Sequence, residues 1–478
     1  TNFTVETRPQ TIGTQQNLYA LYVEDQWAVR PDLTLTLGLR WDYDSLSDGG
    51  GDSGDFNNIA PRFAANWRPD ADSAVRFGAG LFYEKVPYVI VSDALQFSSD
   101  SAAFRGQLQQ LVDQGILPAD TDIARITNAG PQTVTFTDDQ GNAPAFLQGP
   151  TGAAAAALAN DTVSPQLRIL NPEGYDNPFA LQMTLGYQRQ LTDEILFYAD
   201  AVYARGYNLV RLRDVNAPSS FLIEPAQLDG TTPKEINALT RSVAEANATR
   251  PVAPVPGGAS SIIVSETEGR SVFKSLNLNV VKERGDDDYG FRLSYTLSRL
   301  ENDTDDINFR AEDANDFDRD FGPSLNDRKH VINAIGYLYP FEGLTVSIAG
   351  LFQSGQPINR VPDPALFGTA DLNGDGVGFG AQFVGNADRF PGEARNDDRL
   401  PWSKQVDIGV RYEHELPYVP GSIELRADVF NIFNTDNLSG FFANATASNQ
   451  VQFGGTDAIT QRAAGPPRTA QFSVRWLF

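Results

Sequence analysis

The amino-acid sequence predicts an all-β fold, an antiparallel transmembrane β-barrel, on the basis of three observations. Apolar and polar residues alternate strictly over long segments of the chain. Aromatic residues stand near the ends of these segments, and the connections between segments are short and long in turn. Each observation is taken up below in this order.

The alternation is clearest between Leu33 and Tyr43, where leucine and aromatic residues occupy every second position and polar residues or glycine fill the others. The same pattern recurs at 289–298, 406–413, 423–429 and 471–478. Successive side chains of a strand point to opposite faces, so each segment has one apolar and one polar face. A soluble sandwich would share this alternation. The segments nevertheless suit a tilted membrane strand of about 9 to 11 residues better than a soluble strand of about 5 to 6.

Several aromatic residues lie near the ends of the predicted strands. These are Trp27, Trp41, Tyr43, Trp476 and Phe478. A membrane barrel carries a girdle of aromatic side chains at each interface with water, so these positions favour a transmembrane barrel over a soluble sheet.

The connections sort into two kinds. We predict strands at 16–29, 33–44, 59–68, 73–88, 178–191, 195–212, 271–283, 288–300, 328–339, 343–356, 402–416, 421–435 and 467–478. Every second connection is short: 30–32, 69–72, 192–194, 284–287, 340–342 and 417–420. The others are long: 45–58, 89–177, 213–270, 301–327, 357–401 and 436–466. Outer-membrane barrels combine tight periplasmic turns with long extracellular loops, which is the arrangement we expect here.

The number of predicted strands, about thirteen, is odd, whereas a bacterial single-chain barrel closes with an even number. With a periplasmic C-terminus, the long loops are extracellular and the first strand enters from outside. We therefore expect residues 1–478 to form the C-terminal part of a barrel of about 22 strands. The remaining strands and a plug would come from the same gene product or from a second chain.

Composition excludes several classes of function. The chain has no cysteine, which excludes disulfides and thiolate metal sites within it. Its net charge of -24 argues against a nucleic-acid partner, because phosphate binding requires a basic surface. No apolar run approaches the length of a membrane helix; the nearest, 153–159, is short. A mean hydropathy of -0.31 does not argue against a barrel, whose polar interior and loops offset its lipid-facing side.

Stretches spread over most of the chain resemble the Oar-like subgroup of TonB-dependent receptors. They are ALYVEDQWAVRPDLTLTLGLRWD at 20–42, APRFAANWRPDADSAVRFGAGLFYE at 60–84, YTLSRLEND from Tyr295, FDRDFGPSLNDRKHVINAIGYLYPF ending at Phe341, DLNGDG from Asp371, DVFNIFNTDN from Asp428, and the terminal Phe478. The resemblance implies a barrel in the Gram-negative outer membrane, in contact with its lipid and lipopolysaccharide. The family's plug, its TonB-contacting segment and its regulatory-like domain have no counterpart in these residues.

The resemblance implies transport of an unidentified substrate across the outer membrane, coupled to the TonB system through the plug. The alternative is a surface adhesion or assembly platform that acts through the long loops. We expect no enzyme, because His330 and His414, the two histidines of the chain, lie on different predicted strands without a serine motif.

One segment has the spacing of a calcium loop. Asp371, Asn373, Asp375 and Gly376 form D-x-N-x-D-G, in which alternate oxygen side chains and a glycine turn can surround a hard cation. The twelfth position is Gln382, where such a loop normally has a bidentate glutamate. Runs of Asp, Asn and Gly also form ordinary turns, so the alternative is a loop without an ion. Calcium is the one cofactor that the sequence suggests.

Four further groups of residues are expected to be structural. We interpret the acidic stretch 301–320 as a solvated loop, with cation or cationic-cargo binding as the alternative, and the aspartates of 286–288 as part of a turn. The segment 102–114 has apolar residues at helical spacing, which predicts a short helix in a folded lid. Interior arginines are expected to pair with acidic residues across strands or to contact the plug. The arginines are Arg40, Arg292, Arg411 and Arg426, and the acids are Asp42, Asp407, Glu424 and Asp428.

Overall fold

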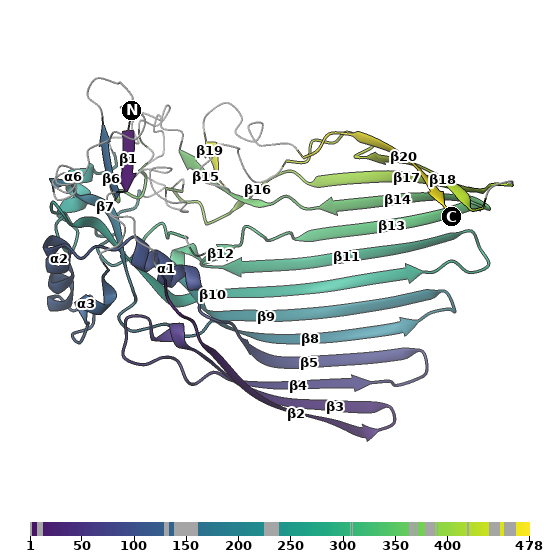
Figure 1. The fold of residues 1–478 in the computed structure, drawn as a ribbon, viewed down its shortest axis with the longest axis horizontal. Helices are drawn as coiled ribbons and strands as arrows, with labels where there is room; N and C mark the ends of the chain where they lie inside the picture. The colour runs from purple at the N-terminus through teal and green to yellow at the C-terminus, as the bar shows by residue number, and fades with distance from the viewer. Residues whose placement is uncertain are drawn as a thin grey trace.

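A computed structural model describes most of the chain. It covers residues 2–6, 13–128, 133–137, 161–223, 239–305, 307, 309–362, 369, 371–377, 388–389, 391–417, 420–438, 450–453 and 465–478. Its main feature is one large sheet in which consecutive long strands are neighbours (Figure 1). Gln382 of the predicted calcium loop lies outside the described residues.

The sheet is an antiparallel meander, as predicted. Thirteen strands lie along its path: β2 (Leu18–Arg30), β3 (Leu33–Asp44), β4 (Ile59–Trp67), β5 (Ser73–Tyr83), β8 (Phe179–Gln190), β9 (Ile195–Asp214), β10 (Ala259–Lys282), β11 (Tyr289–Asn302), β13 (His330–Phe341), β14 (Leu344–Gln353), β17 (Ser403–Glu415), β18 (Ser422–Phe430) and β20 (Thr469–Leu477). Every neighbouring pair along the path is antiparallel. The sequence therefore identified the strands and their order correctly.

The two ends of the sheet differ, and we call them the loop rim and the turn rim. Helices and long connections gather at the loop rim, on the left of Figure 1, and the short connections lie at the turn rim. The turn between β13 and β14 shows how tight the turn rim is. Gly343 has φ +82°, and a Cβ on it would lie 2.3 Å from the carbonyl oxygen of Glu413, so glycine is required there.

The shorter elements lie outside the path of the meander. The strands are β1 (Asn2–Glu6), β6 (Thr133–Thr137), β7 (Ser164–Ile169), β12 (Gly322–Pro323), β15 (Pro357–Pro362), β16 (Asp398–Arg399) and β19 (Gln450–Phe453). The helices are α1 (Tyr88–Gln96), α2 (Ala102–Asp113), α3 (Ile123–Ile126) and α6 (Val243–Ala248), with 3-10 turns η1 (Ser45–Asp48) and η3 (Phe317–Asp320). Among the described residues, no helix is both long and apolar enough to cross a membrane.

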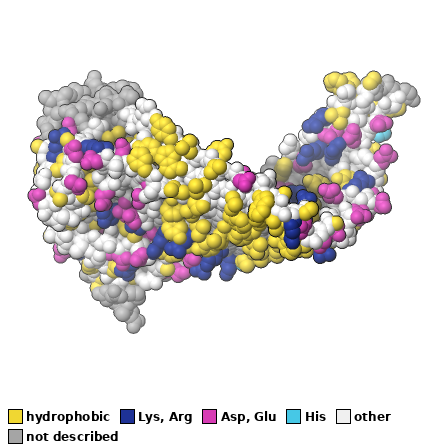
Figure 2. All heavy atoms as spheres, turned by 90° about the horizontal axis from the view of Figure 1, so that it is seen from below, with side chains coloured by type: hydrophobic (Ala, Val, Ile, Leu, Met, Phe, Trp, Pro, Cys, Tyr) yellow, Lys and Arg dark blue, Asp and Glu magenta, His cyan; other side chains and the backbone are white. Residues whose placement is uncertain are grey.

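One face of the sheet is apolar and exposed. The register places Leu37 beside Phe63 and Phe63 beside Ala79, so the apolar positions of successive strands form a continuous surface. Figure 2 shows hydrophobic side chains gathered over the middle of the molecule. Large exposed apolar surfaces are rare on soluble monomers, and this one has the position and character of a lipid-facing band.

The opposite face carries the predicted arginines, but most of them pair along their own strand. Arg40 binds Asp42 at 2.7 Å and Arg426 binds Asp428 at 2.7 Å, both two residues away. Arg411 reaches across to Glu424 at 2.7 Å and also binds Glu413 on its own strand. The prediction of cross-strand pairing was therefore wrong for Arg40 and Arg426, because residues i and i+2 already share a face. Arg292 makes no ion pair within the described part of the chain, and Asp407 accepts hydrogen bonds from Gln405 and Asn431 instead.

The main hydrophobic core lies at the loop rim rather than between sheets. Phe104, Leu108 and Leu111 of α2 are fully buried against residues of α1, α3, β7 and β10. These three residues supply the helical spacing of apolar residues in the segment 102–114, and the short helix predicted there is confirmed. Ser101 caps α2 by accepting a hydrogen bond from the Phe104 amide at 3.0 Å.

Strand β10 begins at Ala259, well before the predicted start at 271. Its early part pairs with β7 in parallel and with the end of β9, so it continues past the rim into the loop core. Its buried residues there, including Ile262 and Val264, do not alternate with polar ones in the simple way of a membrane strand. The prediction of a loop up to residue 270 was therefore wrong for residues 259–270.

The sheet has two open edges, β2 and β20, which do not pair with each other among the described residues. Since the path has an odd number of antiparallel strands, β2 and β20 run in the same direction. All residues of β2 are exposed. Both edges therefore present main-chain donors and acceptors to their surroundings.

Candidate functional site

Buried arginines of the 357–401 segment join the long connections at the loop rim. Arg389 binds Glu312 at 2.6 Å and also Asp320. Arg395, fully buried, binds Asp305 at 2.5 Å and the side chain of Asn302 at 2.6 Å. Arg399, whose side chain is 32% exposed, pairs with the buried Asp327. Acidic side chains of 301–327 are thus held by cations that lie 69 or more residues further along the chain.

The interpretation of 301–320 as a solvated loop was therefore wrong. Asp303 and Asp320 are buried, and Asp303 pairs with Arg211 at 3.4 Å and Arg270 at 3.7 Å. The turn aspartates behave as expected, since exposed Asp288 pairs with Arg284 at the turn rim. The error arose because the cationic partners are remote in sequence and only the folded loops bring them close.

Burial dominates the electrostatics of this network. It raises the pKa of Glu312 to about 7, with Asp320 adding to the shift and Arg389 opposing it. Burial likewise raises the pKa of Asp303, against the attraction of Arg211 and Arg270. Pairs of this kind are strongly destabilised when one partner is removed, because the other charge is left buried alone. The network therefore depends on all of its members to hold the loops together.

The D-x-N-x-D-G segment folds as a compact loop. The Gly376 amide donates to Asp371 Oδ2 at 2.9 Å, and the Asp375 amide donates to Asp371 Oδ1 and to Asn373 Oδ1, each at 3.1 Å. Gly374 and Gly376 have φ of +63° and +90°, which side chains other than glycine rarely adopt. The structure thus brings the three sequence-predicted ligands together on one turn.

Two other connections hold this loop from outside. Arg241 donates to the Gly374 carbonyl, and Arg250 donates to the Asp375 carbonyl at 3.1 Å. Asn373 Nδ2 donates to the Glu312 carbonyl at 2.8 Å. The loop is therefore a junction between the 213–270, 301–327 and 357–401 segments.

Asp388 is a residue of this site that the sequence reasoning missed. Its Oδ1 accepts hydrogen bonds from the amides of Leu372 at 2.7 Å and Asn373 at 3.3 Å, so it packs on the start of the loop. Burial raises its pKa well above the usual range, and the charges of Asp375 and Asp371 add to the shift. Burial also raises the pKa of Asp375 to about 7, with the charge of Asp371 adding to it. Because Asp388 lies beyond the twelfth position of the loop, spacing gave no signal for it.

The two histidines are held apart on different strands. His330 on β13 contacts the Tyr295 hydroxyl through Nδ1 at 2.9 Å and stacks on Trp402. His414 lies on β17, 3.5 Å from the Tyr412 hydroxyl. Each histidine therefore packs against a different set of aromatic side chains.

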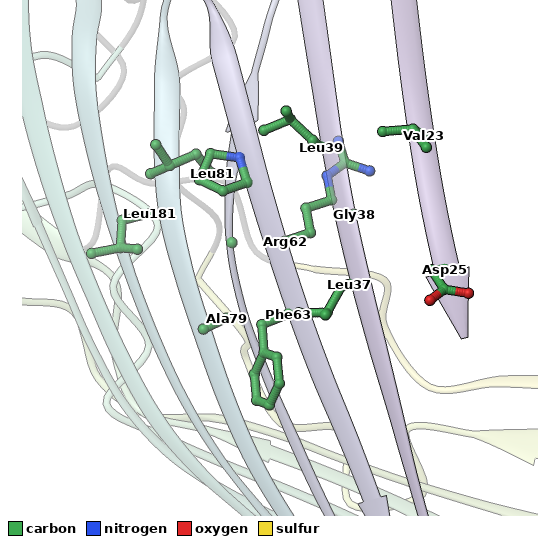
Figure 3. A pocket seen from close by; sticks show the side chains of 12 residues that line it. Val23, Asp25, Leu37, Gly38, Leu39, Arg62, Phe63, Ala79, Leu81 and Leu181 are labelled. Carbon is green, nitrogen blue, oxygen red and sulfur yellow. The ribbon is translucent and has the colours of Figure 1, made fainter. Parts of the chain in front are cut away.

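A shallow hollow of about 570 Å³ lies on the apolar face of the sheet. Its lining comes from five neighbouring strands, β2, β3, β4, β5 and β8 (Figure 3). Small residues such as Ala79 leave room between Leu39, Leu81 and Phe63. Asp25 shares this face, because it stands opposite Leu37 in the register. A carboxylate on the apolar side of an edge strand is costly in a membrane unless a polar group meets it.

Comparisons with known proteins agree with this architecture. A family model described as an outer membrane beta barrel domain matches residues 45–471, and one described as a TonB dependent receptor-like beta-barrel matches residues 2–84. No curated protein matches the chain.

Solved structures resemble the chain at low sequence identity. The outer membrane transporter YddB from Escherichia coli aligns with a TM-score of 0.52 and 13% identity, over 96% of this chain and 45% of its own. A mutant of the ferric enterobactin receptor from Pseudomonas aeruginosa, in complex with enterobactin, aligns with a TM-score of 0.51 and 12% identity, over 96% and 45%. The chain thus spans less than half the length of these structures, and the similarity establishes the fold.

Proposed function

Because this chain belongs to the outer membrane beta barrel domain family, we propose that it forms part of a TonB-dependent transporter that moves an unidentified substrate across the outer membrane. Membership in the family locates the chain in the outer membrane of a Gram-negative bacterium, in a group of receptors and transporters rather than enzymes. Its barrel has the TonB-dependent receptor-like fold.

One observation carries the proposal: a thirteen-stranded meander holds all of its described long connections at a single rim, in one cross-linked layer. A layer of this kind can bind a substrate at the mouth of a barrel, while short turns at the other rim leave the exit clear. In our proposal the loop rim is extracellular, the apolar face contacts lipid and lipopolysaccharide, and a plug connects the barrel to TonB. The Oar-like resemblance of the strands supports this assignment, and no observation on the described residues favours an adhesion platform.

The open edges indicate how the barrel is completed. Unpaired main-chain groups at membrane depth each cost several kcal/mol, so strands from the same gene product or from a second chain must cover β2 and β20. Direct pairing of β2 with β20 would be parallel, which is foreign to an antiparallel meander. Asp25 adds a specific requirement, since the strand that covers β2 should offer it a polar or basic group.

Uptake by cells tests the function. Cells that express the complete gene product, and cells that lack it, would be grown with and without a working TonB system, and compounds removed from the medium would be measured by mass spectrometry. Transport predicts at least one compound whose removal requires both the gene and TonB. Equal removal in all four strains would contradict the proposal.

Mass spectrometry of the protein purified from outer membranes tests the completion of the barrel. We expect a longer polypeptide, or a second chain bound to this one. A closed monomeric barrel with the 52.1 kDa mass of this chain alone would refute that part of the proposal.

A further inference from the structure

The D-x-N-x-D-G loop and the buried Asp388 form one unit that brings three aspartates together. We propose that Asp371, Asn373, Asp375 and Asp388 bind a calcium ion, and that this ion fastens three long connections of the loop rim to one another. This inference does not depend on transport, because a calcium-bound loop layer would serve any barrel of this kind.

The loop leaves oxygen atoms available for an ion. Each carboxylate oxygen has two lone pairs, and the amide hydrogen bonds to Asp371 occupy one on each oxygen. Asp375 Oδ1 accepts one hydrogen bond, from the Val377 amide at 2.7 Å. These bonds orient the carboxylates and leave lone pairs for a cation, as in loops that bind calcium through alternate positions.

Asp388 provides an independent indication of a ligand. Its side chain is 0% exposed, and its Oδ2 has no hydrogen-bond partner in the part of the chain that the structure describes. A buried carboxylate oxygen without a partner is costly, and native proteins rarely leave one unexplained. Since the other oxygen of the same carboxylate is bonded to the amides of Leu372 and Asn373, the group lies against the calcium loop itself.

The described arginines around the loop form no ion pair with its carboxylates. Arg241 and Arg250 donate to main-chain carbonyls of the loop, and Arg250 also pairs with Asp214 at 3.4 Å. Arg389, adjacent to Asp388 in sequence, binds Asp320 and Glu312. In the described part of the chain, no ion pair therefore neutralises Asp371, Asp375 or Asp388. A divalent cation would supply the missing positive charge.

The chemistry of the donors selects calcium. All four are oxygen ligands, which suit hard cations, and the group contains no histidine or cysteine for a transition metal. Among the described residues, no three His, Cys, Asp or Glu side chains already have metal-holding geometry, so the Asn373 amide and main-chain carbonyls would complete the shell. Calcium tolerates such mixed and flexible shells, whereas magnesium demands a nearly ideal octahedron. Asp388 would replace the glutamate that the twelfth position lacks.

The test is calcium binding by the complete gene product, purified in detergent and treated with a chelator. Isothermal titration with CaCl₂ should show one site, with weaker binding of MgCl₂. Asp388→Asn should lower the calcium affinity at least about tenfold, because calcium affinity follows the number of charged ligands. Asp371→Asn should act in the same direction. Asp120→Asn, a matched change at an exposed aspartate outside the loop, should leave the affinity unchanged.

Thermal unfolding separates lost binding from lost folding. Asp388→Asn keeps the shape of the side chain and removes a buried acidic group, so without calcium the variant should melt at or above the wild-type temperature. Added calcium should raise the melting temperature of the wild type and of Asp120→Asn by the same amount, and that of Asp388→Asn by less at every calcium concentration. The proposal is overturned if the wild type takes up no calcium, or if Asp388→Asn binds calcium as tightly as the wild type.

Discussion

Replacing Leu293 with arginine tests the assignment of the apolar face to lipid. Leu293 lies on β11 between Val280 and Ala334 of the neighbouring strands, and its side chain is 43% exposed. It stands four residues from Tyr289, where β11 leaves the turn rim. At about 3.4 Å per residue and a tilt of about 40°, this places it roughly 10 Å into an apolar band about 25 Å high. Arginine near the middle of the band should destabilise the barrel by about 2 to 4 kcal/mol, or roughly 30- to 700-fold in the unfolding equilibrium.

The neighbouring position provides the control. Ser294 pairs with Asn279 and Asn333 on the opposite face of the same strand, so Ser294→Arg should be tolerated at the same depth. Both variants of the complete gene product would be refolded into lipid vesicles and unfolded with denaturant, with the heat-resistant folded band on a gel as the readout. If Leu293→Arg is as stable as the wild type, or both variants lose the same stability, the apolar face does not contact lipid.

Further predictions concern the orientation and the loop layer. A protease site inserted in 89–177 should be cut on intact cells, while one in 417–420 should be protected; the reverse result would invert the orientation. Replacing Arg389 with methionine leaves two buried carboxylates without their cation and should cost about 3 to 5 kcal/mol, measured by thermal unfolding. Phe104→Ala should cost about 3 to 5 kcal/mol and speed proteolysis of the loop layer, whereas Arg105→Ala on the exposed side of α2 should not. Equal proteolysis of the last two variants would show that α2 does not support the layer.

The architecture of the sheet could be predicted from the sequence because its causes are local. A strand with one face toward lipid must alternate with period two, and this requirement is visible within ten residues of β3 or β11. The short turns and long loops could also be predicted, since the length of each connection follows from one continuous segment of the sequence. The helix α2 could be predicted in the same way from apolar residues at helical spacing, and Phe104, Leu108 and Leu111 are buried.

The loop layer could not be predicted because its stabilising contacts join residues that are remote in sequence. No sequence feature near Asp320 indicates that it pairs with Arg389. The acidic stretch was therefore interpreted as solvated, and only the folded structure reveals its partners. The early start of β10 was hidden for a related reason: its first residues are buried in the loop core and lack the alternation that lipid imposes on a membrane strand. By itself the sequence determined the strands, their order and the calcium-like spacing at Asp371. Only the tertiary structure brought Asp388 to that loop, because a buried charge is positioned by the packing of whole segments and leaves no period in the sequence.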